Sequence, residues 1–116
     1  MSEPTIPPHL PAPDEAERAD VARSVVGLFP LEPGAVKATL ESLLDDPSAL
    51  VRTAVADALD AIARRNPELA LTWAEEWAGL APSDVRVQLL RHGLRSLRTA
   101  GNARAFRVTD HVDYQR

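Results

Sequence analysis

The chain of 116 residues has no cysteine, few aromatic side chains and no long apolar run. The absence of cysteine excludes a disulfide framework, a thiolate metal site and a thiol nucleophile. Aromatic residues make up 4% of the chain, so we expect a core of leucine, valine and alanine. No stretch approaches the ~20 apolar residues that span a bilayer, and the first residues lack the basic and apolar regions of a secretory signal. We therefore expect a cytoplasmic protein without a membrane partner.

Lysine is also scarce, because Lys37 is the one lysine beside twelve arginines. With the abundant alanine, this composition is typical of bacterial coding sequences rich in G and C. Acidic residues are missing between Val85 and Val108, a stretch that holds six arginines. Residues 1–84 carry 15 acidic and 6 basic side chains, a balance of −9, whereas residues 85–116 carry 2 and 7, a balance of +5. This asymmetry indicates either an end that faces a polyanion or a solvated helix face offset by the acidic half.

Proline and apolar spacing divide the chain. Residues 1–13 hold five prolines and no apolar period, which predicts a disordered or extended arm. Apolar residues then recur at helical spacing. The predicted helices are Glu15–Leu28, Pro33–Leu44, Ser48–Arg65, Pro67–Leu80, Ser83–Thr99 and a short sixth over Asn102–Val108. The predicted domain therefore covers residues 14–108, and residues 109–116 form a tail without a clear period.

The predicted helix starts recur at a regular interval. The capping residues Asp14, Ser48 and Ser83 are 34 and 35 residues apart. A period in this range is typical of helical repeats, in which stacked helix pairs bury the apolar face that no single pair can cover. The spacing therefore predicts about three helix pairs, and no strand pattern competes with this prediction.

The stretch from Asp45 to Phe106 resembles the HEAT-like repeats of bacterial DNA alkylation-repair glycosylases of the AlkC and AlkD type. The matching positions are Asp46, Ser48, Val51, Arg52, Val55, Ala56, Leu59, Ile62, Pro67, Trp77, His92, Arg95, Leu97 and Gly101. The resemblance implies an all-α fold, a short right-handed α-solenoid of about three HEAT-like helix pairs with five to six helices. It also implies a basic concave surface that grips the DNA backbone. Asp57, Ala58 and Asp60 stand where the family pattern has amide residues, so no catalytic residue is carried over.

Arginines of the last third are the candidate DNA-phosphate ligands. Arg91, Arg95 and Arg98 are spaced to form one stripe along the predicted fifth helix, and Arg86, Arg104 and Arg107 extend it. Guanidinium groups suit bidentate phosphate contact, and several together give an affinity that depends on salt. The alternative is ion pairing with acids of the preceding repeat, such as Glu75, Glu76 or Asp84.

Five other residues are predicted to have structural roles. Arg52 is placed for an ion pair between repeats, with Asp46 or Asp57 as its partner. Trp73 and Trp77 follow the apolar stripe, which favours core packing over stacking on bases. His92 is predicted to make a contact between helices.

Two carboxylates and three histidines are the remaining candidates for catalysis or metal binding. Asp57 and Asp60 are expected to face outward, and a solvated face is favoured over acid–base work because no pocket is evident to shift their pKa values. The histidines lie far apart, so no metal site is predicted. No cofactor fingerprint is present, and no cofactor is expected.

These features leave three hypotheses for function. The first is a non-catalytic module that binds the backbone of duplex DNA. The second is a scaffold that binds another protein or a second copy of itself. The third is a minimal alkylpurine DNA glycosylase that is completed by dimerisation.

Overall fold

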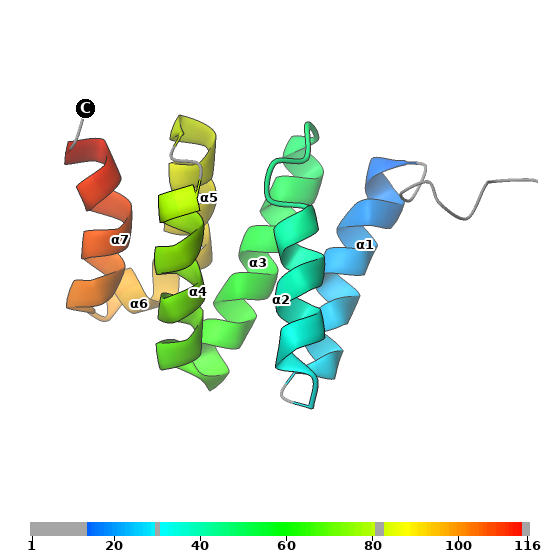
Figure 1. Cartoon of the computed structure of the whole chain (residues 1–116), viewed down its shortest axis with the longest axis horizontal. Helices are drawn as coiled ribbons and strands as arrows, with labels where there is room; N and C mark the ends of the chain where they lie inside the picture. The colour runs from blue at the N-terminus through cyan, green and yellow to red at the C-terminus, as the bar shows by residue number, and fades with distance from the viewer. Residues whose placement is uncertain (1–13, 30, 81–82, 115–116) are drawn as a thin grey trace, which may run out of the picture.

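The computed structural model describes residues 14–29, 31–80 and 83–114, and for residues 110–114 it describes the backbone alone. Within these ranges the chain forms seven α-helices and one short 3₁₀ helix, and no strand occurs there (Figure 1). The predicted all-α class is therefore confirmed. No helix in the described part of the chain is both long enough and apolar enough to cross a membrane.

The first helix pair consists of α1 (Glu15–Val25) and α2 (Pro33–Ser42), which are joined through a 3₁₀ turn at Val26–Leu28. Asp14 caps α1, because its side chain accepts a hydrogen bond from the Glu17 amide at 2.8 Å. Proline at the first position starts α2, where its missing N–H is not needed. The prediction placed these two helices correctly, although each ends earlier as an α-helix than expected.

The second pair consists of α3 (Ala49–Arg65) and α4 (Pro67–Leu80). The Ser48 hydroxyl accepts a hydrogen bond from the Val51 amide, and the Asn66 side chain accepts one from the Leu69 amide. These caps satisfy amides that the first turn of a helix leaves without a partner. Both helices begin where the capping residues predicted.

The last third departs from the prediction. The single helix expected over Ser83–Thr99 is divided at Leu94 (φ −104°, ψ 15°) into α5 (Asp84–Gly93) and α6 (Arg95–Thr99). After Gly101, whose φ of +80° suits glycine, α7 runs from Ala103 to Tyr114. It extends beyond Val108, where the predicted sixth helix ended. Val112 follows Val108 at helical spacing, so the apolar stripe continues into the predicted tail.

The longer helices stand side by side, with α1 and α7 at opposite ends, and the short α6 lies across the lower edge between α5 and α7 (Figure 1). The central helix α3 packs against α1 on one side and α5 on the other, and it also contacts α4 and α6. The last helix, α7, packs against α4 and α5. Residues distant in sequence therefore meet mainly between neighbouring helix pairs.

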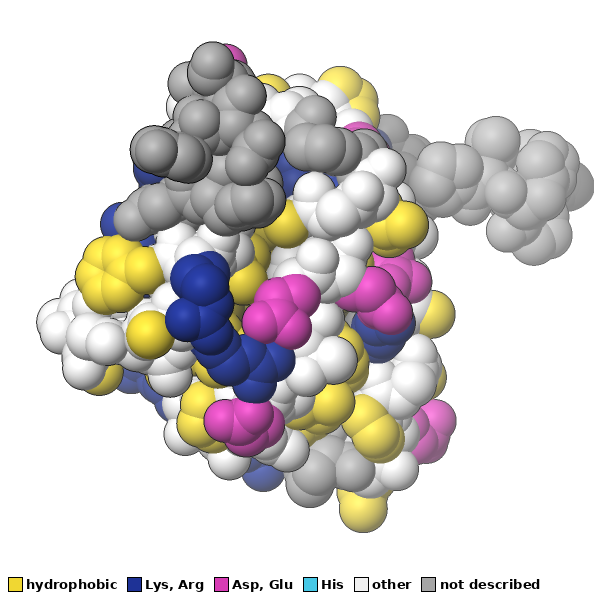
Figure 2. Space-filling view, turned by 60° about the vertical axis from the view of Figure 1, so that its left-hand side comes forward, with side chains coloured by type: hydrophobic (Ala, Val, Ile, Leu, Met, Phe, Trp, Pro, Cys, Tyr) yellow, Lys and Arg dark blue, Asp and Glu magenta, His cyan; other side chains and the backbone are white. Residues whose placement is uncertain are grey.

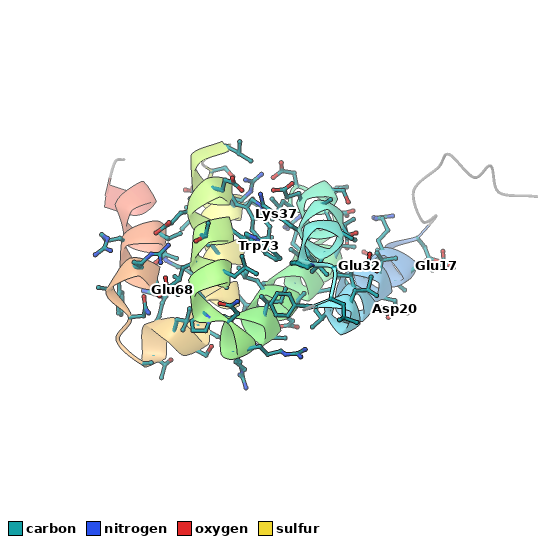
Figure 3. All side chains as sticks on the ribbon, turned by 60° about the horizontal axis from the view of Figure 1, so that its bottom comes forward. Glu17, Asp20, Glu32, Lys37, Glu68 and Trp73 are labelled. Atoms are coloured by element: carbon teal, nitrogen blue, oxygen red, sulfur yellow. The ribbon has the colours of Figure 1, made fainter. Side chains whose placement is uncertain are left out.

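The core is built from aliphatic side chains around two tryptophans. Trp77 is fully buried and Trp73 is 4% exposed, with Trp73 on the side of α4 that faces α2 (Figure 3). Their ring centroids are 6.0 Å apart. The Trp77 indole Nε1 donates to Glu41 Oε2 at 2.9 Å, which links α4 to α2. Both tryptophans thus pack in the core, the role favoured for them over stacking on bases.

Candidate binding surface

Arg86 is not part of the molecular surface. Its side chain is 3% exposed, and Nη2 donates to both carboxylate oxygens of Asp45 at 2.8 and 2.9 Å. Nη1 donates to the carbonyl oxygen of Trp77 at 2.6 Å. The residue predicted as a phosphate ligand therefore joins α5 to α4 and to the loop after α2. DNA could reach this guanidinium only if these contacts broke.

Arg95 faces the acids of α3. Its Nη2 lies 3.3 Å from Asp57 Oδ1 and 3.4 Å from Asp60 Oδ2, and its Nη1 donates to the carbonyl oxygen of His92. His92 Nε2 lies 2.9 Å from the same oxygen of Asp57. His92 thus makes a contact between helices, α5 to α3, as its place in the sequence indicated.

The expectation that Asp60 faces solvent is wrong. Asp60 is 4% exposed, because α5 and α6 pack over this side of α3. Ser96 Oγ donates to Asp60 Oδ1 at 2.8 Å, and Arg64 Nε donates to Asp60 Oδ2 at 3.0 Å. Buried charges need such partners, so this carboxylate holds α6 on α3.

Arg104 bridges two acids of α4. Its Nη1 donates to Glu68 Oε1 at 2.6 Å, and its Nε and Nη2 donate to the two oxygens of Glu75 at 2.9 Å each. The hydrogen bonds from Arg104 hold the pKa of the Glu75 carboxyl below its usual value. Ion pairing with acids of an earlier helix, the alternative to phosphate binding, is therefore present at Arg104.

Arg91 and Arg98 are partly buried, whereas Arg107 is exposed. The guanidinium carbon of Arg98 lies 5.0 Å from the centroid of the Phe106 ring. Arg91 belongs to α5 but Arg95 and Arg98 belong to α6, so the break at Leu94 separates the three arginines that the spacing had placed on one stripe. On the face shown in Figure 2, dark blue basic side chains are flanked by magenta acidic ones.

Asp46 makes an ion pair, but with a residue that the sequence did not indicate. Arg18 donates from Nε and Nη2 to the two carboxylate oxygens at 2.7 and 3.1 Å. The Ser48 amide donates to the same carboxylate at 2.9 Å. Chiefly the hydrogen bonds from Arg18 hold the pKa of Asp46 below its ordinary value. The sequence held no signal for this pair, because its separation of 28 residues differs from the interval of 34 to 35 between the predicted helix starts.

Arg52 lies beside Asp46 and donates from Nη1 to its backbone carbonyl oxygen at 2.7 Å. The carboxylate itself is taken by Arg18, and Asp57 is taken by His92 and Arg95. The ion pair predicted for Arg52 is therefore replaced by a hydrogen bond to the backbone. Arg52 is partly buried and lines a groove.

The groove lies between α3 and α5 and has a volume of about 230 Å³. Each helix contributes one stripe of four residues, spaced as on a single helix face. The lining residues are Ala49, Arg52, Thr53 and Ala56 from α3 and Val85, Gln88, Leu89 and His92 from α5. The surface thus combines small aliphatic side chains with hydrogen-bonding groups and one permanent positive charge.

Gly93 brings the two helices together next to His92, beside the groove. A Cβ atom at Gly93 would lie 2.7 Å from Leu59 Cδ2, 3.1 Å from Leu59 Cβ and 3.2 Å from the carbonyl oxygen of Ala56. The absence of a side chain therefore permits the close contact of α5 with α3.

Among the residues that the structure describes, no group of three or more histidines and carboxylates is placed to hold a metal ion. Comparison of the chain with protein-family models, with curated proteins and with solved structures finds no match. The relation to alkylation-repair glycosylases stays a prediction from the sequence.

Proposed function

We propose that this chain is a non-catalytic scaffold of about three HEAT-like helix pairs, arranged as a short right-handed α-solenoid, and that its partner is a protein. The observation that carries this proposal is that several predicted phosphate ligands form ion pairs within the chain. Three of the six predicted phosphate ligands bind carboxylates of this chain: Arg86 binds one in the α2–α3 loop, Arg95 those of α3 and Arg104 those of α4. Arginines that already form ion pairs with carboxylates of the same chain give little support for a phosphate-binding surface.

The contacts between helix pairs support the repeat. Several hydrogen bonds join residues that are 35 or 36 positions apart, close to the predicted period. They are Arg65 to the Phe29 carbonyl, Trp77 to Glu41, His92 to Asp57, Ser96 to Asp60 and Arg104 to Glu68. This regularity is what stacking of equivalent units produces.

One observation favours DNA-backbone binding as a second candidate. Glu68 is largely exposed, with 80% of its side chain accessible, and Glu75 and Arg107 are exposed as well. Exposed ion pairs contribute about 0–1 kcal/mol. Phosphates could therefore displace Glu68 from Arg104 at little cost, and Arg107 would lie beside them on α7.

Titration of labelled duplex DNA at about 50 and 200 mM salt separates the two candidates. The scaffold predicts no saturable binding at the lower salt concentration. The DNA-binding candidate predicts an affinity that falls steeply with salt and that Arg104→Gln with Arg107→Gln removes. Arg23→Gln with Arg65→Gln, the same charge change at exposed arginines of α1 and α3, is the matched control. Binding that is sensitive to salt and lost only in the first pair of variants would overturn the scaffold proposal.

A further inference from the structure

The groove between α3 and α5 contains Arg52, which forms no salt bridge among the described residues, although its charge helps to hold the pKa of Asp46 low. The ion pairs in that part of the chain include none with Arg52, and its hydrogen bond to the Asp46 carbonyl uses only Nη1. A guanidinium group has five N–H donors in a planar fork. Arg52 therefore retains donors on Nε and Nη2 that can bind a carboxylate from outside the chain.

The lining of the groove carries a positive charge. None of its eight lining residues is acidic, and His92 at one end is held by Asp57. The acids next to the groove are Asp57, which holds His92, and Asp46, which lies beside Arg52. A single cation in this setting complements one negative charge better than a run of phosphates, which the surrounding acids would repel.

The size of the groove limits the kind of ligand. From Ala49 to Ala56 the α3 stripe spans about 10 Å, at 1.5 Å per residue. The volume of about 230 Å³ is below the ~300–1,000 Å³ of enclosed small-molecule sites. Val85, which is 44% exposed, and Leu89 supply apolar surface on the α5 side, and Gln88 adds a hydrogen-bonding amide. A short peptide segment matches these dimensions.

We propose that this groove binds a segment of a protein partner in which one glutamate or aspartate is flanked by aliphatic side chains. The carboxylate accepts hydrogen bonds from Arg52 Nε and Nη2, and the aliphatic side chains contact Val85 and Leu89. This proposal rests on the scaffold function and names the chemistry of its partner. It assigns a binding role to Arg52 in addition to the hydrogen bond with the Asp46 carbonyl.

Two peptides that differ in one charge provide the probe: N-acetyl-Leu-Glu-Leu amide and N-acetyl-Leu-Gln-Leu amide. Each is titrated into the ¹⁵N-labelled full chain, and amide and side-chain signals are followed. We expect saturable shifts at Gln88, His92 and the Arg52 Nε–H with the glutamate peptide. The glutamine peptide should bind roughly tenfold more weakly, the loss typical of a charge-assisted hydrogen bond. Equal binding of the two peptides, shifts located elsewhere or no saturable shift would each overturn the proposal.

Two variants with matched controls test the site itself. Arg52→Gln should lower the affinity for the glutamate peptide roughly tenfold. Arg107→Gln, the same change at an exposed arginine of α7, should leave this affinity unchanged. Val85→Glu adds a competing carboxylate to the groove and should also abolish binding. Val21→Glu is its control, because Val21 on α1 is equally exposed at 44%.

The Val85→Glu variant keeps the test valid if Arg52→Gln unfolds the protein, since an acid in the first turn of α5 favours the helix. Binding that survives Val85→Glu would overturn the proposal. The DNA titration is independent of these measurements. If neither peptide binds and DNA does not bind either, the peptide site in the groove is rejected and the scaffold function stands. If DNA binds with an affinity that falls with salt, the scaffold function is rejected.

Discussion

Among the glycines of the described residues, Gly93 has the tightest surroundings. Gly93→Ala gains about 1 kcal/mol of helix propensity. The new Cβ would lie within 3.2 Å of both Leu59 and the Ala56 carbonyl, and such overpacking costs typically about 1–3 kcal/mol. We expect a net loss of about 1 kcal/mol in the free energy of unfolding, measured by urea denaturation.

Gly79→Ala is the matched control for this substitution. Gly79 also lies in a helix, α4, but a Cβ atom added there would meet no other atom within 4 Å. The substitution should raise the free energy of unfolding by up to about 1 kcal/mol. If both variants gained stability equally, the close contact of α5 with α3 would be incorrect.

The free energy of unfolding should depend on pH through the Asp46 carboxylate. Since its pKa is depressed by Arg18 in the folded state, it stabilises the fold above its unfolded pKa of about 3.9. This contribution is lost as pH falls through the lower, folded pKa. Asp46→Asn should therefore reduce the free energy of unfolding at pH of about 7, and the difference from the wild type should shrink below pH of about 4.

Glu32→Gln serves as the control for Asp46→Asn, because it removes an exposed carboxylate that caps no helix through its side chain. Urea denaturation at neutral and acid pH measures all three proteins. A difference between wild type and Asp46→Asn that stays constant down to pH of about 2 would contradict the role of this ion pair.

The sequence indicated burial of individual side chains better than their partners. Trp73 and Trp77 follow the apolar stripe, and both are buried. Arg52 was assigned an acidic partner, but Arg18 binds the Asp46 carboxylate and Arg52 binds the backbone carbonyl of the same residue. Pairings of this kind depend on how α1 lies against α3, which no local pattern contains.

At the level of helices, Arg86 links three segments: α5, the end of α4 and the loop before α3. Arg86→Ala would leave the Trp77 carbonyl without this donor and would remove a buried aliphatic stem. We expect a loss of about 2 kcal/mol in the free energy of unfolding. Arg107→Ala on the exposed side of α7 should change stability by less than about 0.5 kcal/mol. Similar losses in the two variants, measured by thermal denaturation, would contradict the role of Arg86.

Helix starts were predictable because caps act locally. Asp14, Ser48, Asn66 and Ser83 each accept a hydrogen bond from an amide three residues later. The break between α5 and α6 was not predictable in the same way. Residues 84–99 keep a helical apolar period, with no proline to stop it. The division at Leu94 accompanies contacts that α6 makes with Asp57 and Asp60 on α3.

For the molecule as a whole, α3 is the common neighbour of α1, α4, α5 and α6. No helix pair on either side can therefore separate without exposing its apolar surface. We expect a single cooperative unfolding transition. Tryptophan fluorescence reports α4 alone, since both tryptophans lie there, whereas far-UV circular dichroism reports every helix.

The two signals should give the same midpoint and slope in urea. If the fluorescence changed at a different urea concentration from the circular dichroism, the helix pairs would unfold independently. Leu59→Ala, which shortens a fully buried side chain of α3, should lower both midpoints together. It is expected to reduce the free energy of unfolding by about 2–5 kcal/mol.

The charge asymmetry along the sequence does not carry over directly to the folded surface. Six arginines follow Val85 with no acid among them, yet the fold places Asp45, Asp57, Asp60, Glu68 and Glu75 against them. Packing between helices brings together residues that are 29 to 41 positions apart, so the two parts of the chain partly neutralise each other. A net charge summed along the chain could not show this.

Hydrogen exchange at the Trp77 indole, which is hydrogen-bonded to Glu41, can report local opening of the structure. The indole is fully buried, and its N–H points across from α4 to α2. Deuterium from solvent can replace that proton only when the two helices separate. The exchange rate of one resolved indole signal would therefore give the free energy of opening between neighbouring helix pairs, apart from unfolding of the whole chain.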